Sequence, residues 1–484
     1  MRSVLGPILL LTILGVSGCF GAAGPREDAE DFPASPSIRA GLHPDLAEDV
    51  RSEFLRSYHA YVRVAGDHDE ISPVSGKGTD FFAQGHPVSL ARIESLDTLY
   101  LMEFDAELAA AVDYIADNVS FDIDADFQVF EAIIRVTGGL LSGYHATGDE
   151  RLLSQAKDVT DRLMPAFEKS PTGMPYRFVN LRTGAVSGAN NYLAEIGTCI
   201  TEFGYLSQIT GDSRYVDAAK KALKAVYDRR SAQNLVGTTI NVETGQWVGP
   251  PVVSTINPPV DSFFEYLFEG AKFLGDRDLL TWFETLNGAI IAKQRVVVPA
   301  AAGTGADQNV WFSSNEYSTG VPESLVQSEL AAFYAGLLAE SGQVELGRAY
   351  HDAWKRVLDK GGFRILPEGV NPVQYQATSG TNWLRPEYVD AALLLWFVTN
   401  DTVYVDRAVE YYNNMKVTSR VENGYTVLLD VRTRPERQGD TTPAYWYSEN
   451  MKYYYLMFGR PSRFDYADNY MTTEGNVLRG LLRP

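Results

Sequence analysis

From about residue 45 onward, apolar residues recur with the spacing of amphipathic helices. In the segment 133–144, apolar positions fall at i, i+3, i+7, i+8 and i+11, which places them on one helix face. These positions are Ile133, Val136, Leu140, Leu141 and Tyr144. Similar patterns continue to the end of the chain, so we expect a mostly helical protein.

A recurring turn divides these helices into pairs. Gly or Asn suits the left-handed end of one helix, and Asp suits the N-cap of the next. The turns are Gly148-Asp149, Gly211-Asp212, Gly275-Asp276, Ser341-Gly342 and Asn400-Asp401. The interval of roughly 63 residues holds two helices with their connections, and such a hairpin needs neighbours to bury its faces. We therefore predict a closed ring of helical hairpins.

Acidic residues recur at the same phase of these hairpins, next to the start of alternate helices. They are Glu131, Glu195, Asp261, Glu387 and Glu449, and Glu323 or Glu329 could fill the one missing position. In a closed ring, equivalent ends of the inner helices meet at one opening, so these carboxylates would converge there. The alternatives are coincidence and simple helix capping, because carboxylates also stabilise helix N-termini.

Two of these carboxylates have a charged neighbour one helical turn later. Glu131 and Arg135 stand at i and i+4 and can form an ion pair, whereas Asp261 and Glu265 bring two like charges onto one face. Like charges at this spacing are destabilising unless a cation or a network of sugar hydroxyls separates them. The pattern favours glycoside hydrolysis or metal binding. An inverting glycosidase needs an acid and a base about 6.5–9.5 Å apart, and a wide ring supplies that separation.

The composition excludes several other classes. The chain has 62 acidic and 42 basic residues, a net charge of −20, which argues against a nucleic-acid partner. It has no His-Glu-x-x-His motif, no Gly-x-Ser-x-Gly elbow and no phosphate-binding Gly-Lys-Ser/Thr loop. Two cysteines cannot build a disulfide framework, and Cys199 stands in an apolar stretch where we expect a buried thiol.

The N-terminus has the features of an export signal. Residues 1–18 hold one arginine, an apolar run and then Val16-Ser17-Gly18-Cys19, which resembles a bacterial lipobox. We expect lipidation at Cys19, with ordinary signal cleavage as the alternative. Residues 19–40 are rich in Ala, Gly, Pro and acidic residues, and we interpret them as a flexible tether. We expect a lipid-anchored protein of the bacterial envelope, in the outer membrane, with this anchor as its one membrane attachment.

The motifs together resemble glycoside hydrolase family 47, the class I α-1,2-mannosidases. The matching blocks run from about Val50 to Leu478. They are Glu94-Ser95-Leu96-Asp97-Thr98-Leu99, Phe130-Glu131, Ile134-Arg135, Gly138-Gly139-Leu140-Leu141, Ala194-Glu195, Glu202-Phe203, Asp261-Ser262-Phe263-Phe264-Glu265, Leu384-Arg385-Pro386-Glu387, Ser448-Glu449-Asn450 and Thr473-Glu474. The segment Asp69-Glu70-Ile71-Ser72-Pro73 is similar to the ER degradation-enhancing branch of the family.

The resemblance implies an all-α (α/α)7 barrel over residues 41–484, closed by a short C-terminal β-hairpin plug. It implies that Thr473 binds Ca²⁺, that Glu131 is the general acid and Glu387 the general base, and that Asp261 is a necessary partner or the alternative acid. It also implies a group of residues that hold substrate or its water shell. These are Arg135, Glu195, Glu202, Glu265, Arg385, Tyr445, Glu449 and Glu474.

The expected activity is calcium-dependent, inverting exo-hydrolysis of terminal α-1,2-linked mannose from mannose-containing oligosaccharides, by a monomer. The alternative is a calcium-dependent mannose-binding lipoprotein without turnover, although a lectin needs no acid and base. The chain differs from the family pattern at several points: Gly475-Asn476-Val477 follows Thr473-Glu474, the family's cysteine bridge is absent, Glu329 stands at a family histidine position, and Pro259 stands where the family sets branch preference. These departures concern linkage and branch preference more than the reaction type.

Overall fold

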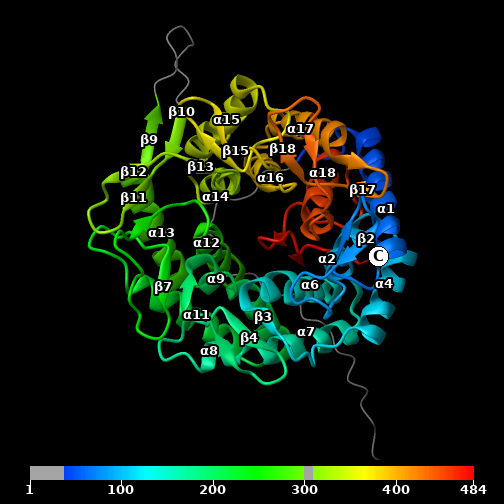
Figure 1. The fold of residues 1–484 in the computed structure, drawn as a ribbon, viewed down its shortest axis with the longest axis horizontal. Coiled ribbons are helices and arrows are strands. Elements are labelled where there is room, and N and C mark those ends of the chain that lie inside the picture. Colours follow the sequence, from blue (N-terminus) through cyan, green and yellow to red (C-terminus); the bar gives the residue numbers. More distant parts are fainter. Residues whose placement is uncertain (1–37, 299–308, 484) are drawn as a thin grey trace, which may run out of the picture.

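Two concentric rings of helices surround a central opening (Figure 1). The computed structural model describes residues 38–298 and 309–483, so Cys19, segment 1–18 and most of segment 19–40 lie outside the described residues. The outer ring consists of α1 (Pro44–Ala65), α4 (Asp105–Asn118), α7 (Glu150–Leu163), α11 (Arg214–Tyr227), α13 (Arg277–Lys293), α15 (Val344–Gly361) and α17 (Val403–Ser419).

The inner ring is built from shorter and more irregular segments that pair in sequence with the outer helices. It consists of α2 (Leu90–Glu94) with α3 (Leu96–Leu101), α5 (Val129–Glu131) with η1 (Ala132–Thr137) and α6 (Gly138–Thr147), α9 (Leu193–Gly197) with α10 (Ile200–Thr210), α12 (Asp261–Leu274), η2 (Glu329–Phe333) with α14 (Tyr334–Glu340), α16 (Glu387–Thr399), and η3 (Trp446–Asn450) with α18 (Met451–Phe458). This arrangement is the expected (α/α)7 barrel. A further short helix, α8 (Pro165–Glu168), follows α7.

The predicted turns connect each inner helix to the next outer helix. Gly148, Gly211, Gly275 and Asn400 all end inner helices with positive φ angles between 55° and 73°. Asp149 then caps α7 by accepting a hydrogen bond from the Arg151 backbone N–H. The sequence pattern therefore predicted these boundaries because capping is a local interaction.

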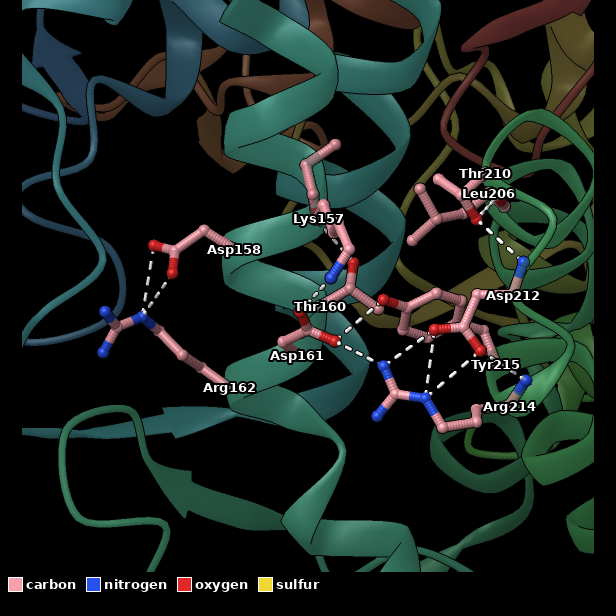
Figure 2. Close-up of polar contacts among 11 residues, drawn as sticks. Lys157, Asp158, Thr160, Asp161, Arg162, Leu206, Thr210, Asp212, Arg214 and Tyr215 are labelled. Atoms are coloured by element: carbon pink, nitrogen blue, oxygen red, sulfur yellow. Dashed lines mark hydrogen bonds and ion pairs between the residues drawn. The ribbon is translucent and has the colours of Figure 1, made fainter.

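Polar contacts link neighbouring outer helices as well. Figure 2 shows Asp161 of α7, which accepts hydrogen bonds from the Tyr215 hydroxyl at 2.8 Å and from the Arg214 guanidinium at 3.3 Å, both on α11. Arg214 also pairs with Asp212, in the turn before α11, at 2.8 Å. The hairpins thus contact one another through side chains in the outer ring as well as through the apolar layer between the rings.

Short strands occupy the connections that lead from each outer helix to the next inner helix. They are β1 (Glu70–Ser72), β2 (Lys77–Thr79), β3 (Asp126–Gln128), β4 (Phe178–Asn180), β5 (Val186–Ser187), β6 (Asn190–Tyr192), β7 (Thr239–Asn241), β8 (Val253–Ser254), β9 (Arg295–Val298), β10 (Asn309–Phe312), β11 (Ser314–Glu316), β12 (Pro322–Ser324), β13 (Gln327–Ser328), β14 (Gly369–Asn371), β15 (Gln376–Ser379), β16 (Arg420–Val421), β17 (Gly424–Tyr425), β18 (Leu428–Asp430) and β19 (Arg437–Gln438). All their pairings are antiparallel, as in β3–β4 and β6–β7. They precede the inner helices, so they lie at the end of the barrel where those helices begin. We call this end the mouth.

A C-terminal hairpin lies inside the ring, as Figure 1 shows in red. Its strands β20 (Tyr470–Met471) and β21 (Val477–Arg479) are antiparallel, which confirms the expected plug. Its turn is closed by a hydrogen bond from the Thr472 backbone N–H to the Asn476 carbonyl at 2.9 Å, with Gly475 at φ 70°. Within residues 38–298 and 309–483, every helix is too short or too polar to cross a bilayer.

Candidate active site

A cavity of about 230 Å³ lies inside the inner ring, and its wall is strongly acidic. Eight carboxylates and two guanidinium groups line it: Glu131, Glu195, Asp261, Glu265, Glu387, Asp390, Glu449 and Glu474, with Arg135 and Arg385. Tyr445 and Thr473 complete the polar lining. The ring of carboxylates predicted from their spacing therefore converges on one cavity, and of the proposed site residues Glu202 alone does not reach its wall.

Helix starts position the key carboxylates. Asp261 is the first residue of α12 and Glu387 is the first residue of α16, where the unpaired backbone N–H groups favour negative charge. Glu131 and Glu449 lie at π-helical turns, since η1 follows Glu131 directly and η3 contains Glu449. Such turns widen the helix and are frequent at functional sites.

Arg135 is the centre of an ion-pair network on one wall. Its guanidinium pairs with Glu131 at 2.6 Å, with Glu474 at 2.8 Å and with Glu94 at 3.0 Å. The guanidinium carbon also lies over two aromatic rings, 5.4 Å from the centroid of Phe81 and 5.3 Å from that of Tyr445. The predicted ion pair of Glu131 and Arg135 is thus present. Arg135 also links the helical segment that carries Glu131 to the C-terminal turn that carries Glu474.

Burial dominates the electrostatics around Glu387 and Asp261. It raises the pKa of Glu387 to about 7, and the nearby Arg385 charge opposes this shift. Burial also raises the pKa of Asp261 to about 6, against the opposing effects of the Ser262 backbone N–H and Arg385. Among the residues that the structure describes, the buried Glu387 Oε2 has no hydrogen-bond partner. Both carboxyls can therefore hold or release a proton near neutral pH.

The floor of the cavity is formed by the C-terminal turn. The Thr473 hydroxyl donates to Glu265 at 3.0 Å, and the Thr473 backbone N–H donates to the Tyr266 hydroxyl at 3.3 Å. That hydroxyl donates in turn to Glu202 at 2.6 Å. Glu202 is therefore one layer behind the floor, where it positions Tyr266, and burial raises its pKa to about 8.

A buried ion pair supports the floor from below. The Lys452 ammonium lies 2.7 Å from the Asp97 carboxylate, and the two side chains are 0% and 1% exposed. Lys452 also donates to the Gly475 carbonyl, and Asp97 accepts from the Val477 backbone N–H at 2.8 Å. The pair thereby holds both sides of the turn that carries Thr473 and Glu474.

Residues 53–480 match the family model of glycosyl hydrolase family 47. The chain belongs to glycosyl hydrolase family 47. It is 32% identical over 469 residues to the human ER degradation-enhancing alpha-mannosidase-like protein 2, covering 92% of this chain and 75% of that protein. It is 29% identical over 492 residues to the mannosyl-oligosaccharide 1,2-alpha-mannosidase MNS1 of Arabidopsis thaliana, covering 95% and 82% respectively.

The solved structures confirm the fold of this family 47 member. The alpha-1,2-mannosidase from Trichoderma reesei superimposes with a TM-score of 0.79 at 23% identity, over 92% of this chain and all of that chain. Family membership and the helical barrel, both expected from the sequence motifs, are therefore confirmed. The chain is a member of a glycoside hydrolase family.

Three carboxylates of this family 47 site had no role in the sequence interpretation. Asp390 lines the cavity three residues after Glu387, so it shares a helix face with Glu387 much as Glu265, four residues after Asp261, shares one with Asp261, and this like-charge pairing could have revealed it. Burial raises its pKa to about 8. Glu94 binds Arg135, and Glu368 binds Arg385 at 3.0 Å. The partners are 41 and 17 positions apart, beyond the reach of helix or strand periodicity, so no local pattern indicates them.

The residues at the floor fit a hard cation such as Ca²⁺, which takes oxygen ligands. The Thr473 hydroxyl oxygen is within 3.0 Å of Glu265, and Glu449 and Glu474 line the same cavity. In the described ranges, no three Asp, Glu, His or Cys side chains are arranged to bind one metal ion directly. A cation here would therefore depend on the oxygens of Thr473 and on water molecules held by the surrounding carboxylates.

Glu323 and Glu329, the two candidates for the missing position in the repeat, lie outside the cavity and differ in burial. Glu329 is fully buried at the start of η2, where its carboxylate accepts hydrogen bonds from Asn382 at 2.8 Å and Tyr411 at 3.0 Å. Glu323 lies in the exposed strand β12. Of the two alternatives, Glu329 therefore fills the missing position in the repeat, although it serves the packing between helices. Cys199 is a buried free thiol, as expected.

Proposed function

We propose that this protein is a calcium-dependent, inverting exo-α-mannosidase that releases terminal α-1,2-linked mannose from mannose-containing oligosaccharides. The observation that carries the proposal concerns Glu387 Oε2, which has no hydrogen-bond partner among the described residues. This atom is buried, and Glu387 lines the same cavity as Asp261 and Glu131. An inverting hydrolase needs a base that can accept a proton from water and an acid on the other side of the scissile bond.

In this mechanism Glu387 takes a proton from the attacking water, which forms a bond to the anomeric carbon as the glycosidic C–O bond breaks. Glu131, directly or through a water, donates a proton to the leaving oxygen, and Asp261 is the alternative donor. The other carboxylates stabilise the positive charge that develops on the sugar ring. Bound Ca²⁺ would supply orientation of the sugar's 2- and 3-hydroxyls.

Two substrates separate the roles of base and acid. α-1,2-Mannobiose needs protonation of its leaving oxygen, whereas α-mannosyl fluoride has a leaving group that needs little acid assistance. We expect Glu387→Gln to lower kcat on both substrates by about 10²–10⁴-fold. The variant that removes the acid, Glu131→Gln or Asp261→Asn, should lose the same range on mannobiose and much less on the fluoride.

Three outcomes of this experiment would contradict the proposal. The first is the absence of mannose release by the parent protein, with oligosaccharide binding retained, which supports the mannose-binding alternative. The second is α-mannose as the first product in an NMR time course, since inversion of an α-linkage gives β-mannose. The third is full activity after removal of calcium by a chelator.

We also propose that Cys19 is lipidated and anchors the enzyme in the bacterial outer membrane. The lipobox-like run Val16-Ser17-Gly18-Cys19 after an apolar segment supports this localisation. Mass spectrometry of the mature N-terminus should find a diacylglyceryl-modified cysteine in the membrane fraction. A Cys19→Ser variant should lack this modification, and detection of an unmodified N-terminus elsewhere would refute the anchor.

A further inference from the structure

Trp383 is an exposed tryptophan next to the catalytic cavity. All seven tryptophans of the chain lie among the described residues, and Trp383 is the most exposed of them, with 43% of its surface accessible. Trp311, Trp354, Trp396 and Trp446 are fully buried. Because a large apolar ring normally gains by burial, an exposed tryptophan beside a site is a candidate for ligand contact.

The backbone of Trp383 is fixed to residues of the site. Its N–H donates to the Glu368 carboxylate at 3.1 Å, and the same oxygen of Glu368 accepts from Arg385 Nε at 3.0 Å. Its carbonyl accepts a hydrogen bond from the hydroxyl of Tyr445. Both Arg385 and Tyr445 line the cavity, so Trp383 lies at its rim, in the loop that leads into α16.

The next residue adopts a conformation that is unfavourable for its type. Leu384 has a φ of 59°, a region that side chains with a β-carbon rarely occupy. It is nevertheless buried, and its N–H donates to the Asn382 side chain at 2.9 Å. A strained backbone conformation persists where the surrounding packing and hydrogen bonds fix it, and strained residues cluster at functional sites. Here the backbone turn buries Leu384 and leaves the neighbouring tryptophan ring on the surface.

We propose that Trp383 is a stacking platform for a pyranose ring on the leaving-group side of the scissile bond. This inference rests on the proposed function and extends it to the second sugar. A tryptophan offers a large rigid face and an N–H donor, and a face held on a fixed backbone loses little conformational entropy on binding. Glu368 and Arg385, 15% and 25% exposed beside it, offer charged partners for sugar hydroxyls.

The test compares Trp383→Ala and Trp383→Phe on two substrates. A linear α-1,2-mannotriose carries leaving-group sugars, whereas α-mannosyl fluoride carries none. We expect Trp383→Ala to raise KM for the trisaccharide roughly 3- to 10-fold with kcat within about twofold, and to leave the fluoride kinetics unchanged. Trp383→Phe should retain most of the affinity. Val417→Ala, at an exposed position on the outer helix α17, is the matched control and should change neither substrate.

Two outcomes would contradict the proposed stacking role of Trp383. An equal loss on both substrates would place Trp383 in the support of the catalytic site, and no loss on either would show that the ring contacts no sugar. Thermal melting of each variant separates these outcomes from misfolding. If the parent hydrolyses neither substrate, the proposed function fails, and calorimetry then tests the platform by itself. In that case Trp383→Ala must weaken binding of the trisaccharide and leave binding of methyl α-mannoside unchanged.

Discussion

The ion pair of Lys452 and Asp97 offers a sharp test of how the cavity floor is held. Lys452→Met keeps the length of the side chain but leaves the Asp97 carboxylate buried without its cation. Removing one partner of a buried pair costs about 3–5 kcal/mol of folding free energy. The Gly475 carbonyl also loses a donor, for which about 1–3 kcal/mol is typical.

The remaining contacts of Asp97 reduce this cost. Its Oδ2 also accepts from the Ser142 hydroxyl at 2.7 Å and from the Val477 N–H at 2.8 Å, and both bonds survive the substitution. We therefore expect Lys452→Met to lower the free energy of unfolding by about 4 kcal/mol. Asp97→Asn should cost about 3 kcal/mol, because the ammonium then becomes the unpaired charge.

The assay is urea unfolding of the parent, the two single variants and the double variant. Replacing both charges leaves no unpaired ion, so the double variant should be at least about 2 kcal/mol more stable than the sum of the single effects predicts. Calorimetric titration with calcium should show weaker binding in each single variant, since the pair holds the turn with Thr473. Additive free energies, or unchanged calcium affinity in Lys452→Met, would refute the reasoning.

Three further predictions follow from the site. The folded-state pKa values of Asp261 and Glu387, about 6 and about 7, exceed the ordinary 3.8 and 4.5, so their protonated forms are favoured on folding. Metal-free protein should therefore melt at progressively lower temperature as the pH rises from 5 to 8; a flat profile would contradict this. Thr473→Val should abolish the rise in melting temperature that calcium produces in the parent; a retained rise would exclude Thr473 as a ligand. Arg135→Met should lower the unfolding free energy by about 3–5 kcal/mol, whereas Arg151→Met, which removes surface ion pairs, should leave it nearly unchanged.

The sequence predicts the helix boundaries and the positions of the wall carboxylates, because these depend on local interactions and on the repeat. Helix caps such as Gly148 and Asp149 act within a few residues, and the repeat placed Asp261 and Glu387 at equivalent helix starts. The convergence of carboxylates followed from the closure of the ring, which the repeat itself required.

The parts that escaped prediction depend on distant contacts. The strands at the mouth are two to four residues long, too short for alternation to be detected, and form only when remote loops meet. Arg135 pairs with Glu94 and Glu474, which are 41 and 339 positions away. Glu202 carries the same chemistry as the wall carboxylates, and its location behind Tyr266 depends on which side of α10 faces the hairpin.

The C-terminal hairpin has a consequence for biosynthesis. Thr473 and Glu474 follow all the described barrel helices in the sequence, yet they form the base of a cavity whose walls begin with Glu131. A ribosome has therefore released nearly every helix before the site can be completed. Premature termination or proteolytic trimming of the tail would leave a barrel with most of its helices but without its base. Completion of the cavity therefore requires synthesis through the hairpin that carries these two residues.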